Sequence, residues 1–247
     1  MVSSNPALAM LGAGALVLSA CGSDDYVIGR FADDSCASHA DAILCSGFEK
    51  PDLSEWSRTI EVNAARVERT ETRSFAGQAA LHASSRADRS AAVAAKEFLP
   101  IDSGDLFLRV HVYVPSGLAT ETMNLLFLGD YATPDPFRGI DFNLESGALS
   151  LYSPESQPDR YTSTASSIPR DRWFCLQIAV AVSADQGTVQ MRIDAEVALE
   201  QGGLNTRPAG GIHLLRAGVD WSSLQSAPFD VYMDNLVLAT TPVACEP

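Results

Sequence analysis

The chain has 247 residues, of which 46% are hydrophobic and 19% are charged, as is usual for a globular protein. A single β-sandwich of this length lies within the normal range for one domain. The net charge of −14 makes a surface that repels phosphate backbones, and no Walker loop occurs, so we expect neither a nucleic acid nor a nucleotide as a partner.

We expect the first residues of the chain to form an export signal, either that of a lipoprotein or an ordinary signal peptide without a lipid. Residues 7–18 form an apolar run that is too short to span a bilayer but fits the core of a signal peptide. The run leads into Leu18-Ser19-Ala20-Cys21, which resembles the lipobox of bacterial lipoproteins. That resemblance implies removal of residues 1–20 and attachment of a diacylglycerol to the thiol of Cys21, so that acyl chains anchor the protein to a membrane.

The segment after the lipobox bears on where the protein resides. Gly22 stands at the position where Asp retains bacterial lipoproteins at the inner membrane. The resemblance therefore implies an exported protein of the bacterial cell envelope, held by its lipid at the outer membrane. Residues 21–44 are short of large apolar residues, and we expect them to form a flexible tether.

The four remaining cysteines predict two disulfides, because an exported protein folds in oxidising surroundings. Four cysteines allow three pairings. We favour Cys36–Cys45, which closes a small loop, and Cys175–Cys245, which fastens the end of the chain to an earlier strand. No Cys-x-x-Cys pair occurs and the four histidines are scattered, so a zinc site is not expected.

Residues 45–247 have the pattern of one domain of short β-strands. Apolar and polar residues alternate with a period of two, and clusters of Gly, Pro, Asn, Asp and Ser separate the runs. Such a pattern indicates an all-β fold of two antiparallel sheets. Single turns of helix are expected at most near residues 51–56 or 88–96. The expected strands lie at residues 106–114, 123–129, 139–145, 148–152, 173–182, 188–198, 212–219 and 229–239.

A more specific likeness begins at residues 173–197, where a Trp opens a strand, a polar turn with Gly follows, and a second strand ends in Ile-Asp. This hairpin resembles that of concanavalin A-like and laminin-G-like jelly rolls, with Ala195 in place of their usual Gly. Three other segments resemble parts of carbohydrate-binding members. The opening strand is matched by "GFEKPDLSEW", the Gly-x-x-Ala-Leu step by "FAGQAAL", and the closing strand by "DVYMDNLVLA". The resemblance implies a jelly-roll β-sandwich, a fold shared by lectins, lyases, hydrolases and inert modules.

Asp141, Asn143 and Glu145 share one face of an expected strand. Their spacing resembles the Glu-x-Asp-x-Glu strand of laminarinase-type glucanases, of which only Glu145 keeps the residue type. A retaining glycosidase needs its carboxyl groups about 5–5.5 Å apart. Residues i and i+4 of a regular strand are ~13 Å apart, so catalysis would need a bulge here. The alternatives are a sugar-binding row and an ordinary solvated face.

Arg109, His111 and Tyr113 share a face of another expected strand. An arginine can bind a carboxylate through two hydrogen bonds, and a tyrosine offers a ring and a hydroxyl, so this face could bind an anionic sugar. The set resembles that of alginate-lyase-type jelly rolls, in which Tyr and His remove a proton. The catalytic candidates are therefore His111, Tyr113 and Glu145, although the accompanying lyase motifs are missing; an ordinary half-exposed strand is the alternative.

Two further sites are expected from the resemblance and from position. In related jelly rolls the first and last strands lie side by side and share a structural calcium, which implies one calcium site at Glu49 and Asp234. The alternative is that Asp234 binds buried backbone amides. Trp221 ends a strand beside a polar turn, where it either stacks on a sugar ring or packs in the core.

The favoured function is that of a membrane-anchored lipoprotein that binds a polysaccharide without cleaving it. The expected partners are a membrane, through the N-terminal lipid, and a polysaccharide. A polysaccharide lyase or glycoside hydrolase on the same fold is one alternative. A structural or protein-interaction lipoprotein with no sugar ligand is the other.

Overall fold

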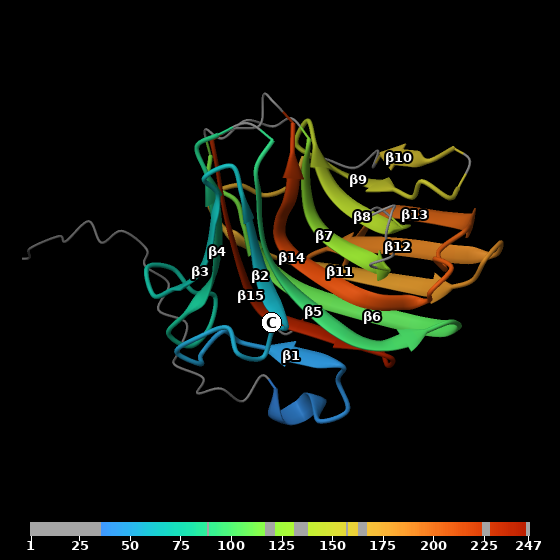
Figure 1. Cartoon of the computed structure of the whole chain (residues 1–247), viewed down its shortest axis with the longest axis horizontal. Coiled ribbons are helices and arrows are strands. Elements are labelled where there is room, and N and C mark those ends of the chain that lie inside the picture. The colour runs from blue at the N-terminus through green and yellow to red at the C-terminus, as the bar shows by residue number, and fades with distance from the viewer. Residues whose placement is uncertain are drawn as a thin grey trace, which may run out of the picture.

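The structure, a computed structural model, describes residues 36–87, 89–116, 122–130, 138–156, 158–162, 167–223 and 228–245. These residues form two antiparallel sheets and one short 3-10 turn, Ala37–His39 (Figure 1). The expected all-β sandwich of two antiparallel sheets is confirmed. The predicted signal peptide, Cys21 and the tether up to residue 35 lie outside the described residues. Within the described ranges, no helix has the length and apolarity needed to cross a bilayer.

Sheet A has eight strands in the described part of the chain. Its order is β13-β12-β11-β6-β15-β4-β3, and β1 pairs with β15 beyond the end of β4. The first and last strands therefore lie side by side. The strands of sheet A are β1 (Leu44–Ser46), β3 (Arg66–Thr70), β4 (Ala80–Ser85), β6 (Gly104–Tyr113), β11 (Trp173–Val182), β12 (Gly187–Ile193), β13 (Glu196–Leu204) and β15 (Phe229–Ala239).

Sheet B has seven strands among the described residues, in the order β10-β9-β8-β7-β14-β5-β2. Consecutive strands β7 to β10 form a meander, whereas β14 and β5 join the sheet from distant parts of the chain. The strands of sheet B are β2 (Arg58–Val62), β5 (Ala91–Ile101), β7 (Met123–Asp130), β8 (Arg138–Glu145), β9 (Ala148–Tyr152), β10 (Arg160–Thr162) and β14 (Ile212–Ser222).

The hydrophobic core fills the space between the two sheets. On β6 the side chains of Leu108, Val110 and Val112 belong to it, and on β8 those of Phe142 and Leu144 do. Burying such side chains contributes about 1.5–3 kcal/mol each. Because successive side chains of a strand point to opposite faces, the intervening polar residues of β6 and β8 lie on the outer faces of two different sheets.

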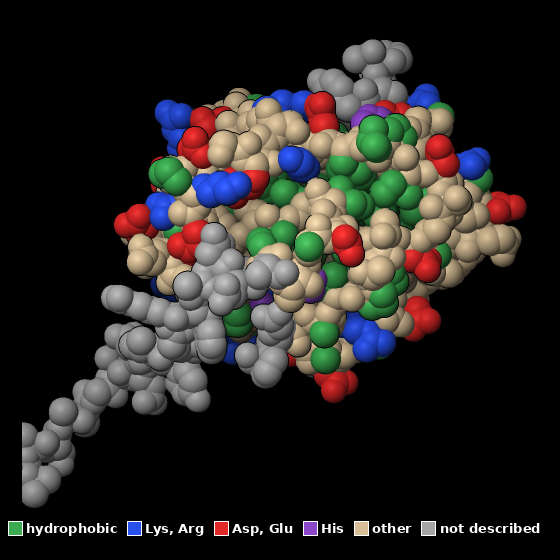
Figure 2. Space-filling view, turned by 90° about the horizontal axis from the view of Figure 1, so that it is seen from below, with side chains coloured by type: hydrophobic (Ala, Val, Ile, Leu, Met, Phe, Trp, Pro, Cys, Tyr) green, Lys and Arg blue, Asp and Glu red, His purple; other side chains and the backbone are tan. Residues whose placement is uncertain are grey.

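The surface carries charges of both signs. On the face seen from below Figure 1, hydrophobic side chains gather towards the middle, and acidic and basic groups are scattered among and around them (Figure 2). No basic stripe is visible among the described residues on that face.

Three local expectations are wrong. Residues 51–56 form a hydrogen-bonded turn and no helix. Residues 91–101 form strand β5, because their small alanines are buried between β14 and β2. The expected strand 188–198 is interrupted, since β12 ends at Ile193 and β13 begins at Glu196.

Both expected disulfides are confirmed. Cys36–Cys45 joins the turn before β1 to β1 itself, over a sequence separation of 9 residues. Cys175–Cys245 joins β11 to the segment after β15, over a separation of 70 residues. The second disulfide closes a long loop, which in the chain-entropy account lowers the entropy of the unfolded chain most.

Two tight hairpin turns hold alanine in a backbone conformation that favours glycine. In the turn between β12 and β13, Asp194 and Ala195 have φ of 48° and 72°. In the turn between β2 and β3, Asn63 and Ala64 have φ of 54° and 59°. Two-residue turns with both φ positive prefer Asn-Gly or Asp-Gly, because a Cβ is strained there. The turn between β8 and β9 follows that preference with Gly147.

Ala195→Gly is therefore expected to raise the free energy of unfolding by about 0.5–1 kcal/mol, since relief of strain outweighs the added freedom of the unfolded chain. Urea unfolding followed by circular dichroism measures this. The matched control is Gly147→Ala, which places a Cβ at an equivalent turn position and should lower stability. A destabilised Ala195→Gly protein would contradict the turn assignment.

Candidate functional site

The outer face of sheet B carries a row of side chains set by strand register. Arg216 of β14 pairs with Phe127 of β7, Phe127 with Asp141 of β8, and Asp141 with Tyr152 of β9. Residues paired across neighbouring strands stand on the same face of the sheet. The row therefore joins a guanidinium, a ring, a carboxylate and a phenol across four strands.

A second row runs beside the first. Trp221 pairs with Asn124, Asn124 with Asn143, and Asn143 with Ser150. The two asparagines and Ser150 are buried, whereas Trp221 is 43% exposed. The two amides therefore lie within the packed surface of the sheet, and the exposed indole stands at the β14 end of the row. The structure therefore brings the predicted Asn143 and Trp221 to the face that also holds Asp141 and Glu145.

A buried ion pair ends the first row. The Nη1 atom of Arg216 lies 2.8 Å from Oδ2 and 3.1 Å from Oδ1 of Asp220. Each of the two side chains is only 8% exposed. The Arg216 guanidinium also lies 5.0 Å from the centroid of the Phe127 ring, within the range of a cation–π contact. Burial raises the pKa of Asp220, and the neighbouring Arg216 opposes that rise.

Hydrogen bonds order the amides of this face. The Nδ2 atom of Asn124 donates to Oδ1 of Asp141, which links β7 to β8. The Nδ2 atom of Asn143 lies 3.4 Å from the carbonyl oxygen of Asp141, a long hydrogen bond. Asp141 is thus held by its neighbours and is half-buried. These contacts fix the side chains before any ligand arrives, so binding need not order them.

The strand that carries Asp141 and Glu145 is regular. β8 pairs with β9 in unbroken register from Asp141 to Glu145. The bulge that would bring these two carboxyl groups to the separation of a retaining pair does not occur in this stretch. At ~3.3 Å per residue, their Cα atoms are about 13 Å apart. The geometry therefore favours binding over hydrolysis by this pair.

The predicted Arg109, His111 and Tyr113 lie on the outer face of sheet A, on the far side of the core from Asp141. Arg109 is 0% and His111 is 2% exposed. The structure therefore does not bring these three residues together with the row on β8, and it does not present the first two to solvent.

Two segments of the same chain cover these side chains. The ring of Phe75 stacks on the imidazole of His111, with their centroids 3.6 Å apart. The C-terminal segment, residues 240–245, crosses the same face, and Arg109 donates from Nη1 to the carbonyl of Ala244 at 3.2 Å. Burial, with the positive charge of Arg109, lowers the pKa of His111 to about 3. At neutral pH this imidazole is a neutral packing group.

Glu49 and Asp234, the predicted calcium ligands, both bind the loop that contains Phe75. Asp234 Oδ2 accepts from the amides of Phe75 and Ala76 at 2.8 and 3.1 Å. Glu49 Oε1 accepts from two amides just beyond Gly77, where a side chain would collide with the carboxylate. Burial raises the pKa of Asp234 to about 7, although its three amide bonds lower it.

These contacts match the alternative in which Asp234 binds buried backbone. Amide hydrogens, which repel a cation, already face three of the four carboxylate oxygens of Glu49 and Asp234. In the part of the chain that the structure describes, no three potential metal-ligating His, Cys, Asp or Glu side chains gather. The donor set fits calcium poorly, and the calcium site stays a prediction.

Arg216, Asp220, Asn124 and Tyr152 were not predicted as site residues from the sequence. A signal for the first pair exists, because an arginine followed four residues later by an aspartate interrupts the apolar run "LLRAGVDW". For the other two no local signal exists. They join the site only through pairing with β8, which the sequence does not reveal.

The two sheets and their strand order define a jelly-roll β-sandwich of the concanavalin A-like type. The structure is similar to the cellulose-induced protein Cip1, with a TM-score of 0.62 and 12% identity, over 82% of this chain and all of that one. It is also similar to an endo-β-1,4-glucuronan lyase from the fungus Trichoderma reesei, with a TM-score of 0.59 and 14% identity, over 77% of this chain and 93% of that one.

A third similar structure is the ligand-binding domain of botulinum neurotoxin serotype D in complex with N-acetylneuraminic acid. Its TM-score is 0.56 at 8% identity, over 85% of this chain and 50% of that one. At such identities the likeness shows the fold alone. No protein-family model and no curated protein matches the sequence.

Asp220→Ala should lower the free energy of unfolding by about 3–5 kcal/mol, because it takes the carboxylate away from the buried Arg216 guanidinium. The double variant Arg216→Met, Asp220→Leu removes both charges and should lower the free energy of unfolding markedly less. Chemical denaturation of both proteins measures the difference. A double variant as unstable as the single one would show that lost packing, and not an unpaired buried charge, causes the loss of stability.

The pH dependence of stability is expected to reveal two opposing groups. The pKa of His111 is about 3 in the folded protein against 6.5 ordinarily, so its stabilising contribution falls as pH drops below 6.5. The pKa of Asp234 is about 7 against 3.8, so its contribution grows as pH drops from 7 and is lost as pH rises through 7. Between about pH 4 and pH 6.5, the loss of stability from His111 and the gain from Asp234 offset each other.

His111→Phe should therefore become more stable on acidification from pH 6.5 to 4, and Asp234→Asn less stable, with the native protein nearly flat between them. Melting temperatures across this range test the expectation. Parallel pH profiles for the two variants would refute it.

Proposed function

We propose that this protein is an extracytoplasmic lipoprotein that binds a polysaccharide across the outer face of sheet B without cleaving it. The observation that carries the proposal is the pair of rows on that face, in which ordered amides and a buried ion pair lie beside the half-exposed Trp221. Convergent polar groups beside an aromatic edge are the usual means of holding a polar ligand of defined shape.

Each element of the face has a role in this binding. The Trp221 indole offers an apolar surface and an N–H to a sugar ring. The Asn124 and Asn143 amides, which can both donate and accept, suit sugar hydroxyls. Tyr152 adds a phenol at the far end of the first row. The Arg216–Asp220 ion pair orders the β14 end of the same face.

The similar structures support a carbohydrate ligand. One is named as a glucuronan lyase, and another is bound to N-acetylneuraminic acid. Carbohydrate recognition therefore recurs on this fold, although the likeness alone does not carry it to this chain. The regular β8 strand supports binding over cleavage.

The anchoring part of the proposal rests on the lipobox-like "LSAC" that ends at Cys21. The acyl chains would hold the sandwich at the outer membrane through the tether, and the two disulfides accord with an exported protein.

Trp221→Ala is expected to weaken polysaccharide binding about tenfold, because stacking on the indole is lost. Affinity gel electrophoresis of the full-length protein in detergent, with neutral and acidic polysaccharides in the gel, measures it. The matched control is Leu99→Ala, which removes another exposed apolar side chain from sheet B, at β5, and should change nothing. Native protein that ignores every polysaccharide, or releases unsaturated or reducing ends from one, would contradict the proposal.

Cys21→Ser should abolish lipid attachment and release the protein from membranes. Mass spectrometry of the full chain expressed in a bacterium, together with membrane fractionation, tests this. Cys36→Ser, which leaves the lipobox intact, is the control and should stay at the membrane. An unmodified Cys21 in the membrane-bound protein would disprove the anchor.

A further inference from the structure

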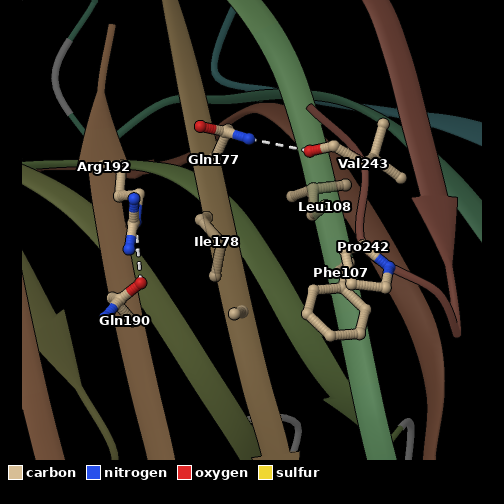
Figure 3. A pocket seen from close by; sticks show the side chains of 9 residues that line it. Phe107, Leu108, Gln177, Ile178, Gln190, Arg192, Pro242 and Val243 are labelled. Atoms are coloured by element: carbon tan, nitrogen blue, oxygen red, sulfur yellow. Dashed lines mark hydrogen bonds between the residues drawn. The ribbon is translucent and has the colours of Figure 1, made fainter. Parts of the chain in front are cut away.

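An open hollow lies on the outer face of sheet A, beside the C-terminal segment (Figure 3). It consists of two adjoining pockets of about 210 and 300 Å³, which share Phe107, Ala179 and Gln190. Together they approach the size of ordinary small-molecule sites. The hydrophobic core separates this hollow from the site on sheet B.

The hollow follows from short side chains between long ones. On β11, Ala179 and Ala181 face outward. Ala179 pairs with Phe107 of β6 on one side and Gln190 of β12 on the other, and Ala181 pairs with Thr188 of β12. A methyl group between larger side chains leaves a trough that runs along β11.

One wall of the trough is apolar and fixed. Phe107 and Pro242 stand together on the β6 side in Figure 3, next to Val243. The Nε2 atom of Gln177 donates to the carbonyl of Val243 at 2.7 Å. The disulfide Cys175–Cys245 fastens the same segment to β11. This wall is therefore in place before a ligand binds.

The opposite wall carries a guanidinium that neutral groups hold. Arg192 donates from Nε to Oε1 of Gln190 at 2.7 Å (Figure 3). It also donates from Nη1 to the carbonyl of Ala195 at 3.4 Å. No ion pair to Arg192 occurs among the described residues, whereas the nearby Arg172 pairs with Asp194 at 2.9 Å. Two of the Arg192 N–H groups thus bind neutral oxygens, and its positive charge can still attract a carboxylate.

The second pocket has the opposite character. Asp105 and Glu200 line it and are exposed, and Thr188 adds a hydroxyl. Carboxylates accept hydrogen bonds from hydroxyl groups and repel another carboxylate. The trough therefore combines one place for a carboxylate with a neighbouring place that excludes one.

We propose that this trough binds an acidic polysaccharide in which uronate residues alternate with neutral ones. The uronate carboxylate lies on Arg192, and the apolar side of its ring packs against Phe107 and Pro242. The neighbouring neutral residue occupies the second pocket, with its hydroxyls towards Glu200 and Thr188. This site is independent of the one on sheet B, so the protein has two saccharide-binding faces.

Isothermal titration of the full-length protein in detergent, with a tetrasaccharide of alternating glucuronate and N-acetylglucosamine, tests the proposal. Ala179→Leu fills the trough from an outward position and should abolish binding. Arg192→Gln removes the positive charge and should weaken binding at least tenfold. Arg172→Gln, which removes an already paired arginine just before β11, should bind as the native protein does.

Two further measurements separate this site from the one on sheet B and fix its ligand. Trp221→Ala should leave tetrasaccharide binding unchanged, and Ala179→Leu should leave binding at sheet B unchanged. An oligogalacturonate of equal length should bind more weakly than the alternating tetrasaccharide, because Glu200 repels its second carboxylate. Glu200→Gln should reduce this difference in affinity. The proposal is overturned if the native protein does not bind the tetrasaccharide at millimolar concentration, if Ala179→Leu binds it normally, or if both oligosaccharides bind equally.

Discussion

The alternation of side chains on paired strands governs both faces of this protein. Packing two sheets buries one side of each strand, so every outward residue must be solvated, covered or bound to a neighbour. Sheet B meets this demand with rows of hydrogen-bonded side chains around Asp141 and the Arg216–Asp220 pair. Sheet A meets it by laying other parts of the chain over Arg109 and His111. The trough on sheet A is the stretch beside the C-terminal segment that neither segment covers.

Much of the fold could be predicted from the sequence, because the core leaves a period-two pattern. The expected strands 173–182 and 229–239 match β11 and β15 at both ends. β5 could not be predicted in this way, since alanine is buried on both faces of the strand and also favours helices. The hairpin at Asp194 was hidden because Ala195 stands where glycine would have marked the turn.

The candidate site was predictable only in part. Alternation on one strand places Asp141, Asn143 and Glu145 on a common face, and the structure keeps them there. Which sheet a strand joins, and what covers it, depends on contacts between residues far apart in the chain. Arg109 and His111 therefore have the pattern of an open binding face in the sequence but lie beneath other segments in the structure.

The disulfide Cys36–Cys45 would have a mechanical consequence if the proposed lipid holds the protein by its N-terminus. Cys45 lies in β1 and pairs with Val237 of β15. A force on the chain before residue 36 would therefore be transmitted through the disulfide directly to β1, and residues 37–44 would not be extended. β1 contributes only three residues to sheet A, whereas β15 pairs with β4 and β6 over most of its length. Under tension β1 would separate from β15 first, which would leave the outer faces of both sheets intact.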